Sequence, residues 1–127
     1  MRAGYEPVGE GVWAIDTLLL RPRMDASHLI LADGRAAFVD VGTSRSAPHL
    51  LNALGAIGVD REAVEYIFLT HIHLDHAGAA WYFAQQGATI YVHPSGLKHL
   101  IDPTKLYNSA KIIYKDKTKL IKLFLLV

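Results

Sequence analysis

Four side chains that can bind a metal ion lie within six residues near the middle of the chain. They belong to the stretch Thr70–Gly78, and they are His71, His73, Asp75 and His76. Imidazole and carboxylate groups together suit one or two Zn²⁺ ions, with iron or manganese as alternatives. The stretch therefore predicts a metal site. A histidine-rich loop that binds no metal is the plain alternative.

The spacing of these residues predicts the directions in which their side chains point. They follow the apolar run Val64–Leu69, which is typical of a buried strand. In an extended segment leaving that strand, His71 and His73 project to the same side, because side chains alternate along it. Asp75 and His76 then lie where the chain turns into a helix, and they can face a second position. This layout indicates a site for two ions that share one water.

The same stretch resembles the signature of a known family. His-x-His-x-Asp-His after an apolar strand and Thr70, followed by Ala77-Gly78, is similar to the motif of the metallo-β-lactamase-fold hydrolases. The resemblance covers the chain from about Val8 to Tyr114. It implies the amino-terminal half of an αββα sandwich, an α/β (α+β) fold with a mixed β-sheet and covering helices.

The resemblance also implies a function. A binuclear, zinc-type hydrolase of this family uses a metal-bound hydroxide to attack an ester, thioester, lactone or amide carbonyl of a small-molecule substrate. His71 and His73 are then expected to hold the first ion, and Asp75 and His76 the second. Asp75 is also the candidate catalytic residue, because it can accept a proton.

Three further residues are candidates around this loop. Asp40 ends an apolar strand, where a carboxylate is costly to bury without a partner, and alone it is equally a cap of a turn or helix. The resemblance implies that Asp40 orients a metal ligand without binding the ion, and Thr70 is expected to support the ligands in the same indirect way. His93 follows the apolar stretch Ala88–Val92 and is a candidate to line the site. A loop histidine without such a role is the alternative.

The elements that must position these residues follow from periodicity and turn signals. A β-meander is expected first, with strands around the turn Gly9-Glu10-Gly11, at Leu18–Leu20, at 27–32 and at 36–41. A helix from about Ser46 to Gly55 or Gly58 then leads to the strand 64–69. A second helix at 78–84 and a strand at 88–92 complete an alternating pattern, which indicates that part of the sheet is parallel. Helices at 97–101 and 103–113 are expected to follow.

Composition limits the class of protein. The chain has 127 residues, of which 51% are hydrophobic and 20% are charged, so one globular domain is expected. A formal net charge of +1 gives no reason to expect a nucleic acid or a membrane as partner. No secretory signal or apolar run long enough to span a bilayer is visible, so a cytoplasmic protein is expected.

The last residues differ from the rest. All seven lysines lie in the last thirty residues and all six arginines in the first half, which suggests a boundary between residues 1–114 and an atypical Lys-rich and apolar tail, 115–127. Family members take a third histidine, a bridging aspartate and a final histidine from their carboxyl-terminal half. We therefore expect an incomplete chain that is weakly active or inactive alone. The alternative is a non-catalytic remnant or interaction module with a vestigial metal loop, and an exposed sheet edge could support self-association.

Overall fold

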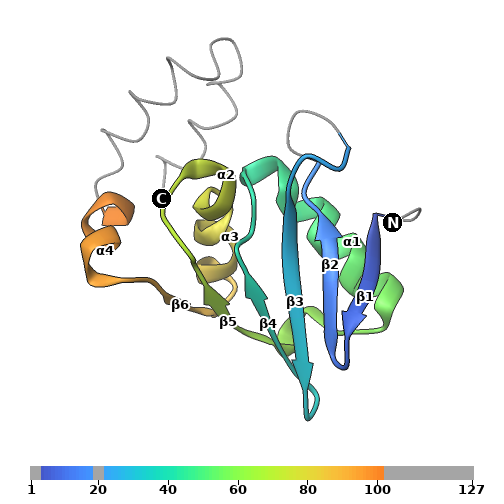
Figure 1. Ribbon diagram of the computed structural model, residues 1–127. Coiled ribbons are helices and arrows are strands. Elements are labelled where there is room, and N and C mark those ends of the chain that lie inside the picture. The colour runs from blue at the N-terminus through green and yellow to red at the C-terminus, as the bar shows by residue number, and fades with distance from the viewer. Residues whose placement is uncertain (1–3, 19–21, 102–127) are drawn as a thin grey trace.

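The computed structural model describes residues 4–18 and 22–101. The tail boundary expected at residue 115 and the helix expected at 103–113 lie outside these residues. Within them, the chain forms one mixed sheet whose strands follow each other in chain order, β1-β2-β3-β4-β5-β6 (Figure 1). The strands are β1 (Tyr5–Gly9), β2 (Val12–Asp16), β3 (Ala26–Ala32), β4 (Arg35–Val39), β5 (Val64–Phe68) and β6 (Thr89–Tyr91).

The strand pairing changes from antiparallel to parallel at β4. Strands β1 to β4 form the expected antiparallel meander, and the β3–β4 hairpin turns at Asp33-Gly34, both of which have positive φ. Strands β4, β5 and β6 pair in parallel. Each parallel step requires a crossover, and helices supply it. The expected α/β fold with a mixed sheet and covering helices is confirmed.

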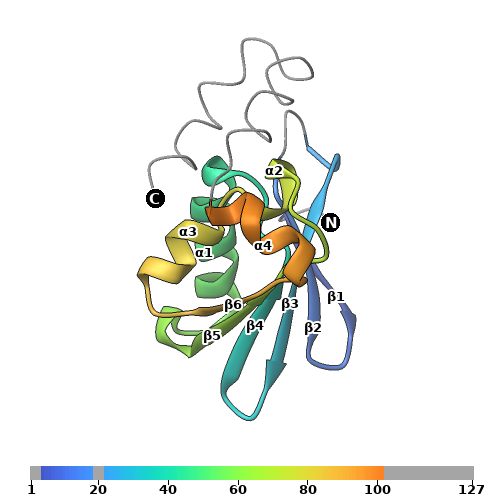
Figure 2. The same ribbon diagram turned by 90° about the vertical axis from the view of Figure 1, so that its left-hand side faces the viewer.

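The helices are α1 (Ala47–Ile57), α2 (Leu74–Ala77), α3 (Ala80–Gln85) and α4 (Pro94–Ile101), with short 3-10 turns η1 (Ser44–Ser46) and η2 (Arg61–Ala63). Helices α1 and α3 lie on the same face of the sheet, which is clearest in the side view (Figure 2). Among the described residues, no helix has both the length and the apolar character that crossing a membrane requires.

The core lies between the sheet and these two helices. Leu29, Phe38 and Ile67 point from three strands toward α1 and α3, and they are fully buried together with Leu50 of α1. The ring of Phe38 packs 5.3 Å from that of Phe83 on α3. Burying each such side chain stabilises the fold by about 1.5–3 kcal/mol. The core therefore holds the crossover helices against the sheet, and β5 leads directly into the metal loop, Thr70–Gly78.

The other face of the sheet presents apolar side chains to the surface. Ile30, Phe68 and Tyr91 are exposed there, and the rings of Phe68 and Tyr91 stack at 5.2 Å. Tyr66 joins this group, with its ring 5.7 Å from that of Tyr91. Strands β1 and β6 form the two edges of the sheet. Self-association through such an edge stays a prediction.

A register shift interrupts the β4–β5 ladder. Ala36 pairs with Val64 and Ala37 pairs with Tyr66, so Glu65 is an extra residue on β5. Its carboxylate lies 2.6 Å from the guanidinium of Arg35, and this hydrogen bond and charge raise the pKa of Arg35. Beyond the shift, Val39 pairs with Phe68 at the end of both strands. Such bulges re-aim the residues that follow them.

Three boundaries differ from the sequence expectation. Leu18 lies outside a strand with φ of 54°, because the side chain of Asp16 turns the chain by accepting the backbone N–H of Leu18. The metal loop enters the separate four-residue helix α2 before α3 begins at Ala80. Helix α4 begins at Pro94 rather than at residue 97, since proline is well suited to the first turn of a helix.

Candidate metal centre

The candidate residues meet at the edge of the sheet where β4 and β5 end. Parallel pairing of these strands brings Asp40 beside the metal loop, and the backbone N–H of Asp40 donates to the carbonyl of Phe68 at 2.9 Å. Strand β3 runs antiparallel to β4, so its first residues lie at the same edge. In Figure 1 this edge is the upper end of the strands, beside α2. Three segments that are far apart in sequence therefore converge there.

Asp40 is 7% exposed and has a positive φ of 59°. Its Oδ1 accepts the backbone N–H of Thr70 at 2.9 Å, and its Oδ2 accepts the Thr70 hydroxyl at 2.6 Å. The same Oδ2 lies 3.0 Å from Nδ1 of His76. Aspartate tolerates the left-handed backbone better than most residues, so its carboxylate can be aimed inward at this strand end. These contacts connect Asp40 to Thr70 and His76, and its role in orienting a metal ligand stays a prediction.

These hydrogen bonds also define which ring nitrogens are free. A carboxylate only accepts, so Nδ1–H of His76 donates to Asp40. The Thr70 hydroxyl gives its single proton to Asp40, and its oxygen therefore accepts Nδ1–H of His71 at 2.8 Å. In both imidazoles Nε2 is then the ring nitrogen that these hydrogen bonds leave available to a metal ion. Thr70 thus connects Asp40 to His71 through its hydroxyl.

The structure brings the four predicted ligands together. The ligand atoms of His71, His73 and Asp75 all lie within 4.8 Å of one another. The rings of His71 and His73 are 5.0 Å apart, and those of His71 and His76 are 4.1 Å apart. Asp75 belongs to a second grouping as well, with His76. It therefore lies between the two predicted ion positions rather than on one side only.

Asp25 is the residue that the sequence interpretation missed. It forms a grouping with Asp75 and His76, in which the ligand atoms also lie within 4.8 Å of one another. It directly precedes β3, which begins at Ala26. The predicted antiparallel meander could have indicated Asp25, because a residue directly before β3 lies at the sheet edge where β4 ends. Nothing in the local sequence around Asp25 marks it.

His93 has a different local role. Its Nδ1 accepts the backbone N–H of Ser95 at 3.1 Å and lies 2.7 Å from the Ser95 hydroxyl, so the ring caps the start of α4. The imidazole is exposed, and the ligand groupings formed by the described residues do not include it. Its predicted role in lining the site stays a prediction.

Close backbone packing fixes the loop. The N–H of Val41 donates to the carbonyl of His76 at 2.7 Å, and the N–H of Ala79 donates to that of Gly42 at 3.0 Å. Gly78 permits this approach. A Cβ there would collide with the carbonyl of Leu74 and lie 2.9 Å from Cα of Thr43. The small residues after the motif histidines thus let α2 rest on the strand end that carries Asp40.

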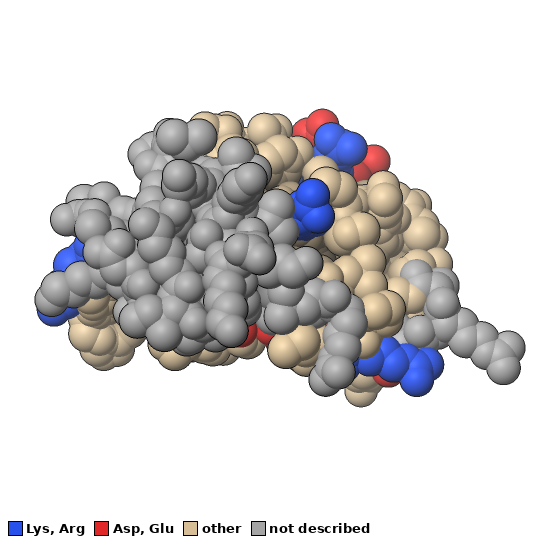
Figure 3. Space-filling model, turned by 90° about the horizontal axis from the view of Figure 1, so that it is seen from above, with Lys and Arg blue, Asp and Glu red and all other residues tan. Residues whose placement is uncertain are grey.

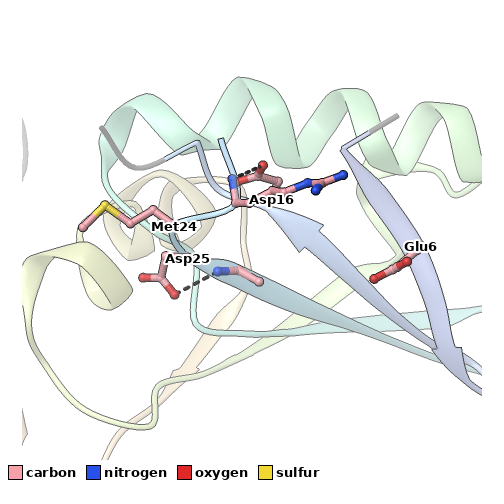
Figure 4. Close-up of a pocket in the computed structure, with 6 residues that line it drawn as sticks. Glu6, Asp16, Met24 and Asp25 are labelled. Atoms are coloured by element: carbon pink, nitrogen blue, oxygen red, sulfur yellow. Dashed lines mark hydrogen bonds between the residues drawn. The ribbon is translucent and has the colours of Figure 1, made fainter. Parts of the chain in front are cut away.

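A pocket of about 540 Å³ adjoins the centre beside Asp25 (Figure 4). The carboxylates of Glu6, Asp16 and Asp25 and the side chain of Arg23 line it. Seen from above, basic and acidic side chains of the described residues lie beside one another in small groups (Figure 3).

The donor set fits a divalent ion. Two imidazoles have Nε2 free, a third imidazole is adjacent, and Asp75 offers an acceptor-only carboxylate. Nitrogen and oxygen ligands in this mixture suit zinc and its neighbours. The described residues thus include groups that can hold a metal ion.

Comparison with known proteins identifies the family: the chain belongs to the metallo-beta-lactamase superfamily, whose profile matches residues 20–122. This confirms the resemblance seen in the motif.

Solved structures show the same fold. A variant metallo-beta-lactamase from Cronobacter sakazakii superimposes with a TM-score of 0.67 and 24% identity, covering 76% of this chain and 36% of that chain. A metallo-beta-lactamase from Novosphingobium pentaromativorans gives a TM-score of 0.65 and 25% identity, with 76% and 34% covered. One from Legionella gormanii gives 0.67 and 15%, with 76% and 35% covered. The chain thus spans about a third of the length of these proteins.

One curated relative is similar over a shorter stretch. It is a protein named as a ribonuclease, from Thermus thermophilus, and it is 38% identical over 53 residues. The match covers 42% of this chain and 12% of that protein.

Proposed function

We propose that this chain supplies metal ligands of a zinc-type hydrolase that acts on an ester, thioester, lactone or amide carbonyl of a small molecule. One observation carries the proposal: the ligand atoms of His71, His73 and Asp75 lie within 4.8 Å of one another. Family membership supports it, because the superfamily is generally one of metal-dependent hydrolases.

Each residue has a role in the proposed reaction. A bound divalent ion supplies Lewis acidity, polarising the carbonyl and lowering the pKa of water. His71 and His73 are proposed to hold one ion through imidazole nitrogens, and Asp75 and His76 to hold a second. Asp40 and Thr70 keep Nε2 of His71 and His76 free for this purpose. The carboxylate of Asp75 is also proposed to accept the proton that the attacking water gives up.

We infer low turnover for the 127-residue chain by itself. Four predicted ligands shared by two ions give each ion two, whereas catalytic zinc sites have about three protein ligands. Ions held in this way exchange readily and activate water poorly. Efficient hydrolysis of ester or lactone substrates by this chain, lost on His71→Ala, would contradict the inference.

Metal binding is the direct test of the proposal. The chain is dialysed against Zn²⁺, its zinc content is measured by atomic emission, and the affinity is measured by isothermal titration calorimetry. We expect bound zinc in the wild-type chain and a loss of at least tenfold in affinity in His71→Ala. His49→Ala is the matched control, because His49 is exposed on α1 and belongs to none of the ligand groupings among the described residues. Absence of bound zinc in the wild-type chain would refute the proposal.

An interaction module with a vestigial metal loop is the second candidate. The exposed and stacked rings of Phe68 and Tyr91 favour it, since exposed apolar surface often marks a binding face. A folded chain that binds no metal would support this candidate. Nuclease activity has only the short match to the ribonuclease in its favour. The net charge of +1 does not provide the basic surface that nucleic-acid backbones attract.

A further inference from the structure

We propose that Asp25 is a metal ligand, completing the second ion position together with Asp75 and His76. The inference rests on the proposed metal-dependent function, and it adds a residue from outside the motif. Asp25 lies on the loop before β3, far in sequence from the motif residues at 71–76.

Three donor atoms converge at this position. Nε2 of His76 lies 3.4 Å from Oδ2 of Asp25 and 3.4 Å from Oδ2 of Asp75. These distances exceed the usual 2.7–3.2 Å range of N–H···O hydrogen bonds, at about 0.2 Å beyond its upper end. A tetrahedral site with metal–ligand bonds of ~2.0–2.1 Å has ligand atoms ~3.3–3.4 Å apart. The observed separations match that spacing between ligands.

The hydrogen-bond network supports the same assignment. Nδ1–H of His76 is already directed at Asp40, so Nε2 is the ring nitrogen that faces Asp25 and Asp75. The two carboxylates that meet there repel each other. His76 therefore has three carboxylates around one ring, from Asp25, Asp40 and Asp75. A cation between Nε2 and the two outer carboxylates would offset this negative charge.

Asp25 is held in place for this role by its own loop. Its Oδ1 accepts the backbone N–H of Ala26 at 2.8 Å, which leaves Oδ2 to face His76. Its carbonyl accepts the N–H and the hydroxyl of Thr17, both at 3.1 Å. Asp16 secures the other end of the loop by accepting the N–H groups of Leu18 and Arg23, both at 2.8 Å. The side chain is thus oriented before any ion binds.

The position is also reachable from solvent. The side chain of Asp25 is 19% exposed and lines the pocket described above (Figure 4). With Asp25 included, the second position has the three protein ligands that catalytic zinc sites commonly use. It gains its third ligand from the β2–β3 loop.

Metal stoichiometry tests this inference without any measurement of activity. The wild-type chain, Asp25→Asn and Asp33→Asn are titrated with Zn²⁺, and the ions bound per chain are counted at saturating free Zn²⁺. We expect two ions in the wild-type chain and at least a tenfold loss of affinity at one of the two sites in Asp25→Asn. Asparagine keeps the Oδ1 acceptor for Ala26. Asp33→Asn makes the same chemical change in an exposed turn and should bind like the wild-type chain.

Cobalt spectroscopy provides a second variant. Co²⁺ replaces Zn²⁺, and Asp25→His exchanges an oxygen ligand for a nitrogen ligand, so its visible absorption bands should shift from those of the wild-type chain. Far-UV circular dichroism confirms that each variant is folded. Unchanged affinity at both sites in Asp25→Asn, or an unchanged cobalt spectrum in Asp25→His, would overturn the role of Asp25 alone. A wild-type chain that binds no ion would overturn the proposed function together with it.

Discussion

The carboxylate of Asp40 binds both polar groups of Thr70, with Oδ1 on the backbone N–H at 2.9 Å and Oδ2 on the hydroxyl at 2.6 Å. The two residues are 30 positions apart in sequence, and the parallel pairing of β4 with β5 brings them together. This contact links the strand end to the first motif histidine, because the same hydroxyl accepts Nδ1–H of His71.

Replacing Asp40 by asparagine should weaken zinc binding by about 10- to 100-fold. The amide NH₂ must replace one carboxylate oxygen, so it meets a donor from either Thr70 or His76 and no longer orients both. Asparagine tolerates the positive φ at this position, so the fold should persist. The measurement is a zinc competition titration. Asp33→Asn is the control, since Asp33 also has a positive φ but lies in the β3–β4 turn. Equal zinc affinities in both variants would contradict the orienting role.

Thr70 allows a test with two variants of opposite expectation. Thr70→Ser keeps the hydroxyl and should retain near wild-type zinc affinity. Thr70→Val keeps the shape but removes the link between Asp40 and His71, so its affinity should fall by about tenfold. Calorimetric titration of both variants checks this. If valine and serine behave alike, the hydroxyl is not what orients His71.

Gly78→Ala should destabilise the folded chain by about 1–3 kcal/mol, since a Cβ would overpack the junction of α2 with the loop after β4. Gly55→Ala is the matched control. It lies in α1, where a Cβ meets nothing within 4 Å, and it should stabilise the chain by about 0.5–1 kcal/mol. Urea unfolding measures both. Equal effects of the two substitutions would argue against close packing at Gly78.

Zinc should stabilise the folded chain, because its ligands converge only when the strands are paired. At a free concentration 100 times the dissociation constant, one bound ion adds about 2.7 kcal/mol to the free energy of unfolding. For a domain of this size the thermal midpoint should rise by roughly 10 °C, and a chelator should reverse the shift. Differential scanning calorimetry with and without zinc makes the comparison. A midpoint that does not respond to zinc would contradict a metal site formed by the folded state.

The local sequence predicted much of the fold because each signal was short-range. The hairpin at Asp33-Gly34, the strand β5 and the helix α1 all follow from turn chemistry and periodicity over a few residues. The expected burial of β5 was wrong, because only Val64 and Ile67 are buried and Phe68 is exposed on the outer face of the sheet. A turn into a helix was expected at Asp75 and His76, but its division into α2 and α3 was not, since four residues are too few to establish a helical period. The capping contact of His93 at the start of α4 was not anticipated, because its hydrogen bond with the backbone N–H of Ser95 is visible only in three dimensions.

The residues of the candidate site also fall into two groups, those that local sequence predicts and those that only the fold brings together. His71, His73, Asp75 and His76 are close in sequence, and their spacing alone indicated that they would meet. Asp25 lies 50 positions before Asp75, and only the pairing of β3 with β4 and of β4 with β5 brings it to the same place. A search for sequence motifs finds the four motif residues, whereas finding Asp25 requires the order of the strands in the sheet.

The extra residue in β5 marks a place where the chain can change in length. Val64 pairs with Ala36 and Tyr66 pairs with Ala37, so Glu65 has no partner of its own on β4. Deleting Glu65 would make these two pairs consecutive in a regular ladder, and Phe68 would still pair with Val39. The side chains after the deletion would keep their faces, and Thr70 would still reach Asp40. A chain shortened by this one residue should therefore keep the arrangement of the histidines that follow.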